Sequence, residues 1–67
     1  MFTLTINGEP RSLPQPCTVA ELLASLRHDS KRVAVEVNQA VVPAAQHAQH
    51  RLHPGDKVEI VTFVGGG

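Results

Sequence analysis

The sequence predicts an α+β fold in which one helix packs across one face of a mixed sheet of four to five strands. Three observations predict it. Apolar and polar residues alternate as in strands near both ends of the chain, in 2–6 and 57–64. Between them, 18–26 has the apolar spacing of an amphipathic helix. That helix has a single apolar stripe, and a sheet is the partner that can cover it.

Residues 2–13 indicate a β-hairpin. In 2–6 the apolar residues alternate with threonines, so the apolar ones share the core face. Asn7-Gly8 follows, a dipeptide that accepts positive φ in a tight turn. We expect the return strand at 11–13, where the flanking prolines favour an edge of the sheet over its centre.

The helix is predicted from its start signal and its stripe. Thr18 stands three residues before Glu21, which fits a capping box. The stripe consists of apolar residues at helical spacing: Val19, Leu22, Leu23 and Leu26. Arg27-His28 near the end suits the negative end of the helix dipole. Asp29-Ser30 is expected to end the helix.

A second strand pair follows the helix. The basic pair Lys31-Arg32 is expected to be solvated at the junction between helix and strand. Residues 33–37 indicate a strand with its three valines on one face. A turn at 38–39 leads to a short strand at 40–42, which Pro43 stops.

The rest of the chain predicts a loop and the last strand. Residues 44–51 are polar with alanines and form at most a turn or two of helix. Pro54-Gly55 is placed for a type II turn before the strand at 57–64. Because the first and last strands are the most apolar, we place them side by side at the centre. Such a sheet with one helix across it is a β-grasp, the ubiquitin-like architecture, here a domain of residues 1–64 with a flexible tail at 65–67.

The composition argues against several classes of partner and site. The formal net charge is zero and there is no Trp or Tyr for base stacking, so nucleic acid is a poor candidate partner. No apolar run approaches the length of a membrane span. The lone Cys17 allows neither an internal disulfide nor a four-cysteine metal site. One unpaired cysteine without a signal peptide is expected in a reducing cytoplasm.

Three glycines, Gly65, Gly66 and Gly67, follow the last predicted strand. A glycine segment has no side chains, so it can thread a narrow channel and present a terminal carboxylate to the active site of another protein. Glycine also has the largest backbone entropy to lose, so it contributes little to holding a terminus down. The alternatives for this tail are a frayed terminus or a cloning scar.

The last strand also predicts a docking surface. Val61 and Phe63 alternate with the residues that face the helix, so they should be partly exposed on the other face. Together with Val64 they would form an apolar surface beside the tail, and such surfaces commonly bind partners. The alternative is that the loop at 44–51 folds over this surface.

Four segments carry a family resemblance: Thr18–Leu23, Val33–Asn38 with Val42-Pro43 following, Gly55–Val61, and Phe63–Gly67. Together they resemble the ThiS family, the sulfur carrier proteins of thiamine biosynthesis, over essentially the whole length. A Gly-Gly end alone is shared with ubiquitin and with the small subunit of molybdopterin synthase. Ala44 is a departure, because many relatives have a basic residue after the proline.

The resemblance implies chemistry at the Gly67 carboxylate, which Gly65 and Gly66 would deliver. An E1-like adenylating enzyme of the ThiF type would join this carboxylate to AMP. Sulfur relayed by a cysteine desulfurase would displace the AMP and leave a thiocarboxylate, from which a thiazole synthase of the ThiG type would take the sulfur. The partner enzyme consumes ATP, and the carrier is expected to bind no cofactor and to be no enzyme.

Alternatives remain open for the same tail. The chain would then be a small subunit of molybdopterin synthase, or a ubiquitin-like modifier that Gly67 joins to lysines. In a plain structural adaptor the tail would be irrelevant.

Two further features suggest sites that we do not expect. Histidines recur every third residue, at His47, His50 and His53. Two histidines one helical turn apart can bind the same metal ion. Pro54 follows and no carboxylate is close in sequence, so solvated loop histidines are favoured and no metal site is expected. Cys17 could hold sulfur as a persulfide, but a small buried hydrophobe is the favoured role.

Overall fold

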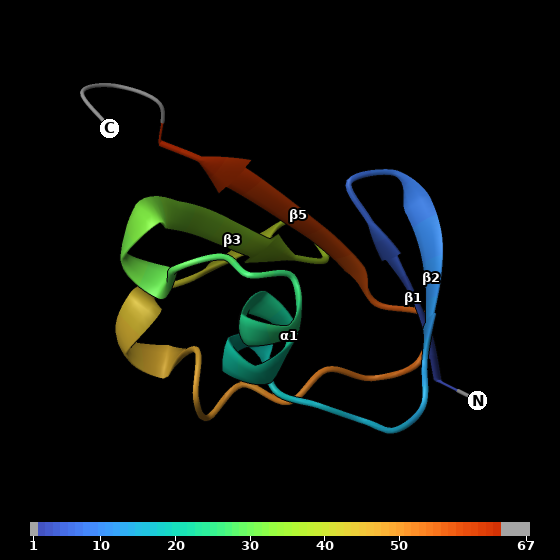
Figure 1. Ribbon diagram of the computed structural model, residues 1–67. Coiled ribbons are helices and arrows are strands. Elements are labelled where there is room, and N and C mark those ends of the chain that lie inside the picture. Colours follow the sequence, from blue (N-terminus) through green and yellow to red (C-terminus); the bar gives the residue numbers. More distant parts are fainter. Residues whose placement is uncertain (1, 64–67) are drawn as a thin grey trace.

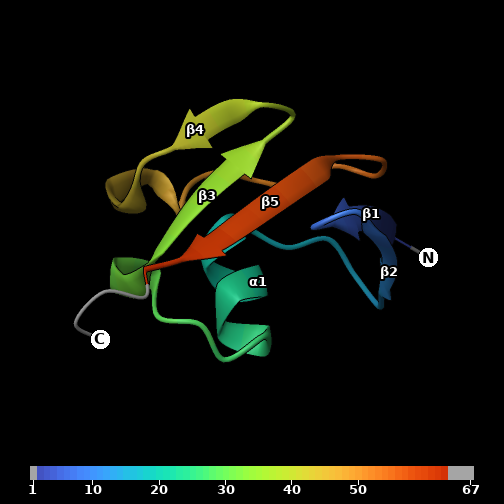
Figure 2. The same cartoon turned by 90° about the horizontal axis from the view of Figure 1, so that it is seen from above.

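The computed structural model describes residues 2–63 and confirms the predicted β-grasp architecture. In chain order the elements are β1 (Phe2–Ile6), β2 (Glu9–Leu13), α1 (Val19–Ser25), the 3₁₀ helix η1 (Ser30–Arg32), β3 (Val33–Val37), β4 (Ala40–Val42), the 3₁₀ helix η2 (Ala44–Gln46) and β5 (Lys57–Thr62). The strands form one mixed sheet in the order β2-β1-β5-β3-β4. Helix α1 lies across one face of this sheet (Figures 1 and 2).

Strand β5 is the centre of the sheet, as predicted. It pairs in parallel with β1, where Thr5 and Ile6 lie opposite Lys57 and Val58. On its other side it runs antiparallel to β3. The last strand is therefore held on both sides, in the middle of the sheet (Figure 2).

Both predicted tight turns are present. Asn7 and Gly8 have φ of 51° and 85°, and Asn38 and Gln39 have φ of 52° and 72°. Two-residue hairpin turns of this kind require positive φ at both positions. Strand β2 is longer than predicted and includes Pro10, which an edge strand tolerates because one side of its backbone makes no ladder bonds.

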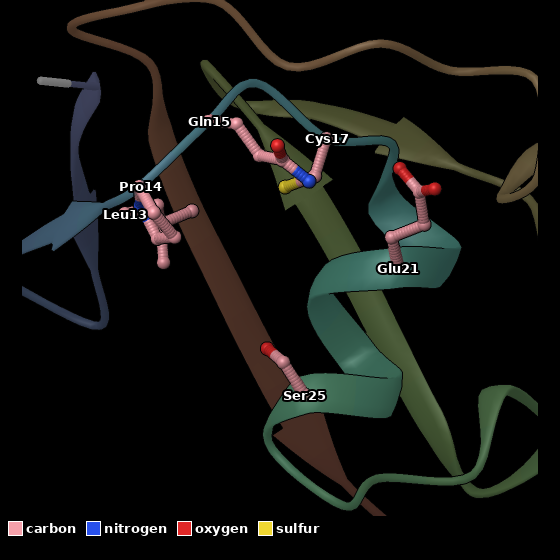
Figure 3. Close-up of a pocket in the computed structure, with 6 residues that line it drawn as sticks. All are labelled: Leu13, Pro14, Gln15, Cys17, Glu21 and Ser25. Carbon is pink, nitrogen blue, oxygen red and sulfur yellow. The ribbon is translucent and has the colours of Figure 1, made fainter.

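The helix begins as predicted. The Glu21 N–H donates to the Thr18 hydroxyl at 3.1 Å, and the Thr18 N–H donates to the Glu21 carboxylate at 2.8 Å. This reciprocal pair is the capping box, and it satisfies backbone donors that a helix N-terminus leaves free. Figure 3 shows Glu21 on the first turn and Cys17 in the loop just before it.

The helix ends earlier than predicted, and Arg27-His28 lies beyond its last turn. Leu26 is the C-cap and Arg27 is left-handed, with φ of 62°. The Arg27 N–H donates to the carbonyl of Ala24, and the His28 N–H donates to the carbonyl of Leu23. These bonds form a Schellman motif, where glycine is the usual left-handed residue. Because arginine stands there instead, the sequence carried no clear stop signal at this point.

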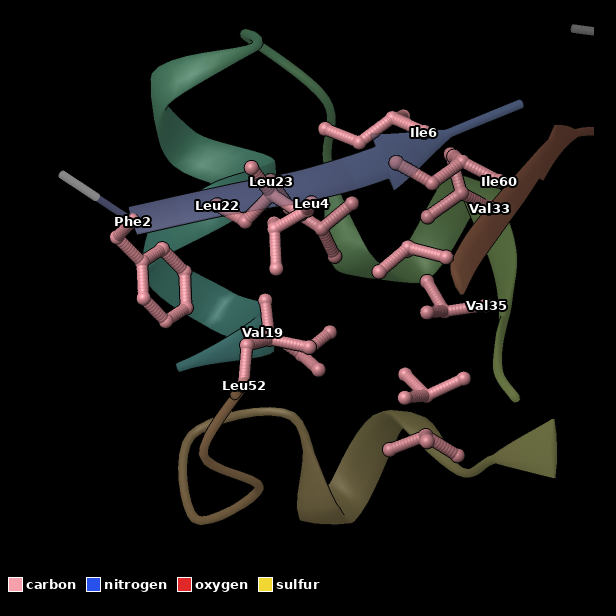
Figure 4. Packing of buried hydrophobic residues seen from close by; sticks show 13 residues of the cluster. Phe2, Leu4, Ile6, Val19, Leu22, Leu23, Val33, Val35, Leu52 and Ile60 are labelled. Carbon is pink, nitrogen blue, oxygen red and sulfur yellow. The ribbon is translucent and has the colours of Figure 1, made fainter. Parts of the chain in front are cut away.

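The hydrophobic core lies between α1 and the sheet (Figure 4). Its residues are Phe2, Leu4, Ile6, Val19, Leu22, Leu23, Val33, Val35, Val37, Val42, Leu52, Val58 and Ile60. The alternating apolar residues of β1, β3 and β5 all point to this side, as the period-two pattern predicted. The opposite face of the sheet therefore carries the remaining side chains of these strands.

Two asparagines hold β5 in place from either side. The Asn7 side chain accepts from the Ile60 N–H at 2.8 Å and donates to the Ile60 carbonyl at 3.2 Å. The Asn38 side chain accepts from the Lys57 N–H at 3.0 Å and donates to the Asp56 carboxylate at 3.0 Å. Each asparagine thus serves both as a left-handed turn residue and as a lateral support of the central strand.

Replacing Asn7 with alanine should therefore destabilise the fold. The change removes two hydrogen bonds to β5. It also leaves alanine at positive φ, a conformation that asparagine accepts more readily because its short polar side chain forms local hydrogen bonds. We expect a loss of about 2 to 3 kcal/mol in the free energy of unfolding. Asn7→Gly is the matched variant, because it loses the hydrogen bonds but accepts the conformation. Urea unfolding of the three proteins measures both contributions, and equal stability of all three would contradict this role.

Candidate functional site

The candidate site is the end of β5 and the outer face of the sheet around it. Along β5, Val58 and Ile60 are buried under α1, so Glu59 and Val61 point to the opposite face. Val61 is 59% exposed and Phe63 is 60% exposed. Their exposure agrees with the predicted strand orientation, while their role in docking stays a prediction.

The backbone is anchored up to Phe63. Strand β5 ends at Thr62, earlier than the predicted residue 64, but the Phe63 N–H still donates to the carbonyl of Arg32 at 2.9 Å. The remaining predicted site residues, which are Val64, Gly65, Gly66 and Gly67, lie outside the described residues. The structure therefore fixes the backbone up to Phe63, and the role of the glycine tail stays a prediction from the sequence.

The loop at 44–51 does not cover the exposed valine and phenylalanine. It packs against the start of α1, where the carbonyls of His47 and His50 accept from the N–H groups of Ala20 and Val19, each at 2.9 Å. These N–H groups have no partner inside the helix, so the loop completes the helix N-terminus. Since the loop is bound there, no segment within residues 2–63 buries Val61 or Phe63.

The outer face also includes a residue that sequence reasoning missed, Val41 on β4, which is 69% exposed. Val42 is buried, so the alternation along β4 alone could have placed Val41 on the outer face. In the β3–β4 ladder Val41 lies opposite Glu36, and in the β3–β5 ladder Ala34 lies opposite Val61. Apolar side chains from both ladders thus share the face on which Phe63 lies exposed.

The expectation of solvated loop histidines is wrong for His47. Its side chain is buried, at 1% exposure, and its Nε2 lies 3.0 Å from the carbonyl oxygen of Val42. The 3₁₀ turn η2 directs this ring inward, whereas His50 is half-buried and His53 is exposed. Among residues 2–63, no group of three or more His, Cys, Asp or Glu side chains is arranged to hold a metal ion.

Cys17 lies at a shallow groove between the loop after β2 and helix α1 (Figure 3). It is half-buried and packs against the core. Burial, and then the charge of Glu21, raises the pKa of the Cys17 thiol above its ordinary value. A thiol with a raised pKa is a weaker source of thiolate, which agrees with a packing role rather than a persulfide role.

No helix within the described range is both long enough and apolar enough to span a bilayer.

Comparison with known proteins identifies clear relatives. A model of the ThiS family matches residues 4–67. The sulfur carrier protein ThiS of Thermus thermophilus is 36% identical over 62 residues, which are 92% of this chain and 95% of that protein. A crystal structure of the thiamine biosynthesis protein ThiS from Geobacter metallireducens superposes with a TM-score of 0.84 at 33% identity, and covers 98% of this chain and 100% of that one.

Two relatives, both named thiazole synthase, are much longer than this chain. The thiazole synthase of Paramagnetospirillum magneticum is 50% identical over 64 residues, which are 96% of this chain and 20% of that protein. The chain thus spans about a fifth of the length of that relative.

Proposed function

Because the chain belongs to the ThiS family, we propose that it is a sulfur carrier of thiamine biosynthesis and that its working group is the C-terminal carboxylate of Gly67. In this proposal an adenylating enzyme activates the carboxylate and a sulfur donor converts it to a thiocarboxylate. A thiazole synthase then removes the sulfur. The chain itself acts as a protein co-substrate and supplies no catalytic residue.

The observation that carries the proposal is the extent of the family match, which runs through the three glycines to Gly67. The fold is consistent with it. Strand β5 is bonded on both sides and its backbone is anchored to Phe63, so the segment that follows starts from a fixed point. Three glycines, fully extended, span about 10 Å, which is enough to place Gly67 inside a partner while the sheet stays outside.

The chemistry needs activation because a carboxylate is a poor electrophile. Attack of the Gly67 oxygen on the α-phosphorus of ATP forms the acyl-adenylate and releases pyrophosphate. A persulfide sulfur on the donor then attacks the acyl carbon and expels AMP, and reduction of the resulting acyl disulfide by a thiol leaves the thiocarboxylate. Gly67 has no Cβ, so nothing on the carrier crowds the attack at its carbonyl carbon.

Thiazole synthase is the partner that the relatives support. The Paramagnetospirillum magneticum protein that contains a segment 50% identical to this chain is named a thiazole synthase. A second such protein, from Magnetococcus marinus, is 39% identical over 62 residues. Fusion of a carrier to its acceptor enzyme keeps the two at high local concentration, so these relatives favour an encounter between this chain and a thiazole synthase.

Pyrophosphate exchange tests the first step. The chain is mixed with the adenylating enzyme of the same organism, ATP and labelled pyrophosphate. We expect label to enter ATP only when the chain is present, at a rate that saturates with its concentration. Exchange that does not depend on the chain would contradict the proposal. A Gly-Gly-Gly remnant on lysines of other proteins after proteolysis would instead indicate a protein modifier.

A further inference from the structure

The backbone at the end of β5 is held by a hydrogen bond to the turn that precedes β3. One residue beyond the last pair of the β3–β5 ladder, the Phe63 N–H donates to the Arg32 carbonyl at 2.9 Å. On the side of β1, the last hydrogen bonds to β5 within residues 2–63 join the Asn7 side chain to Ile60. The backbone at Phe63 is therefore held from the side of β3, through Arg32.

The Arg32 carbonyl belongs to a short turn that depends on Asp29. The 3₁₀ helix η1 ends at Arg32, and Figure 2 shows it, in green, against the end of β5. The N-cap of η1 is Asp29, whose carboxylate accepts from the Lys31 N–H at 2.9 Å and whose carbonyl accepts from the Arg32 N–H at 2.8 Å. Asp29 is exposed and forms no ion pair within residues 2–63, so its structural contribution is the closure of this turn.

The bond from Phe63 to Arg32 sets the number of residues between the folded domain and the reacting carboxylate. Four residues, 64–67, follow Phe63, and a segment of that length reaches at most about 14 Å. If the bond opens, the segment gains a residue, and more backbone conformations place the Gly67 carboxylate away from the position in which it reacts. The need to fix one further residue lowers the frequency of correct placement by about 5- to 30-fold.

We propose that Asp29 is a positioning residue for the reaction of the Gly67 carboxylate. The Asp29 carboxylate stabilises η1, and η1 presents the Arg32 carbonyl to the Phe63 N–H. Phe63 is then the fixed point from which the Gly67 carboxylate reaches the α-phosphorus of ATP. This inference rests on the proposed function and adds a residue that acts on the reaction from outside the last strand and the tail.

Loss of the cap tests the proposal. Asp29→Ala removes the acceptor of the Lys31 N–H, whereas Asp29→Asn removes the charge but keeps a side-chain oxygen that can cap. In Asp29→Ala the hydrogen exchange of the Phe63 amide, followed by NMR, should be about fivefold faster or more, the factor by which loss of a typical cap changes an opening equilibrium. The kcat/KM for the chain in pyrophosphate exchange should fall about 3- to 30-fold. Asp29→Asn should keep both values near those of the wild type.

Thr18→Ala is the matched control. Thr18 caps the start of α1 with the same kind of bond, whereas Asp29 follows the end of that helix. Thr18→Ala should lower the melting temperature at least as much as Asp29→Ala does. Because Thr18 does not hold η1, the hydrogen exchange of the Phe63 amide and the kcat/KM should stay at wild-type values. The melting curves also show that each variant is folded.

Three results would overturn the inference and leave the proposed function intact. The first is a Phe63 amide that exchanges its hydrogen at the wild-type rate in Asp29→Ala, or faster without a fall in kcat/KM. The second is an equal fall of kcat/KM in Thr18→Ala, since the loss would then follow from general stability. The third is an Asp29→Asn variant as impaired as Asp29→Ala. A wild-type chain that supports no pyrophosphate exchange would overturn the proposed function together with this inference.

Discussion

Deletion of Gly67 is expected to abolish thiocarboxylate formation while the domain stays folded. The reason is that the terminal carboxylate then belongs to Gly66 and lies one residue, about 3.5 Å, short of the position from which it would attack the α-phosphorus of ATP. A misplacement of even 1 Å can lower a rate about a hundredfold, so the loss should be complete within detection. Pyrophosphate exchange and thiazole formation measure it.

The control for this deletion is the stability of the domain. Among residues 2–63, every core residue lies between Phe2 and Ile60, so the melting temperature should not change. Addition of one alanine after Gly67 should also abolish thiazole formation, because the terminal carboxylate then lies one residue too far from the sheet. Retained thiazole formation by either variant would show that the terminal carboxylate is not the working group.

The second large effect is expected at the apolar end of the outer face. Val61→Asp and Phe63→Asp each place a charge on the docking surface that the sequence predicts. Loss of a contact at the centre of an interface weakens binding by about 2 kcal/mol or more, roughly thirtyfold. The fold should tolerate both changes, because Val61 and Phe63 are 59% and 60% exposed. Binding of the adenylating enzyme is the measurement.

Ser12→Asp is the matched control, since Ser12 is exposed on the edge strand β2. It should bind the enzyme like the wild type. Unfolding of Val61→Asp or Phe63→Asp would show that these side chains support the core. If both variants bind the enzyme with wild-type affinity, Val61 and Phe63 are not part of the docking surface.

Local patterns predicted most of the fold. The apolar alternation in β1, β3 and β5 determined which face each strand buries, and Asn7-Gly8 marked the first turn because few residues accept positive φ. The alternation along the last strand also predicts that Val61 and Phe63 are exposed on the face opposite α1, as the structure shows. These features depend on residues near one another in the chain, which is why the sequence was sufficient.

Features that depend on long-range packing were not predicted. The burial of His47 follows from the contact of its segment with the start of α1, and its loop is polar in sequence. The bond from Phe63 to Arg32 follows from the register between β3 and β5, which a single sequence does not specify. The left-handed residue just after the helix is Arg27, where glycine is usual. The sequence therefore contains no clear signal for the end of the helix.

If Gly67 carries the sulfur, the intact mass of the chain changes when the chain is loaded. The wild type is incubated with the adenylating enzyme, ATP, a cysteine desulfurase, cysteine and a thiol reductant, and is then measured by mass spectrometry. We expect the mass change for exchange of one oxygen for one sulfur, and fragmentation should locate this change at Gly67. An unchanged mass, or sulfur added at Cys17 instead, would show that Gly67 does not carry the sulfur.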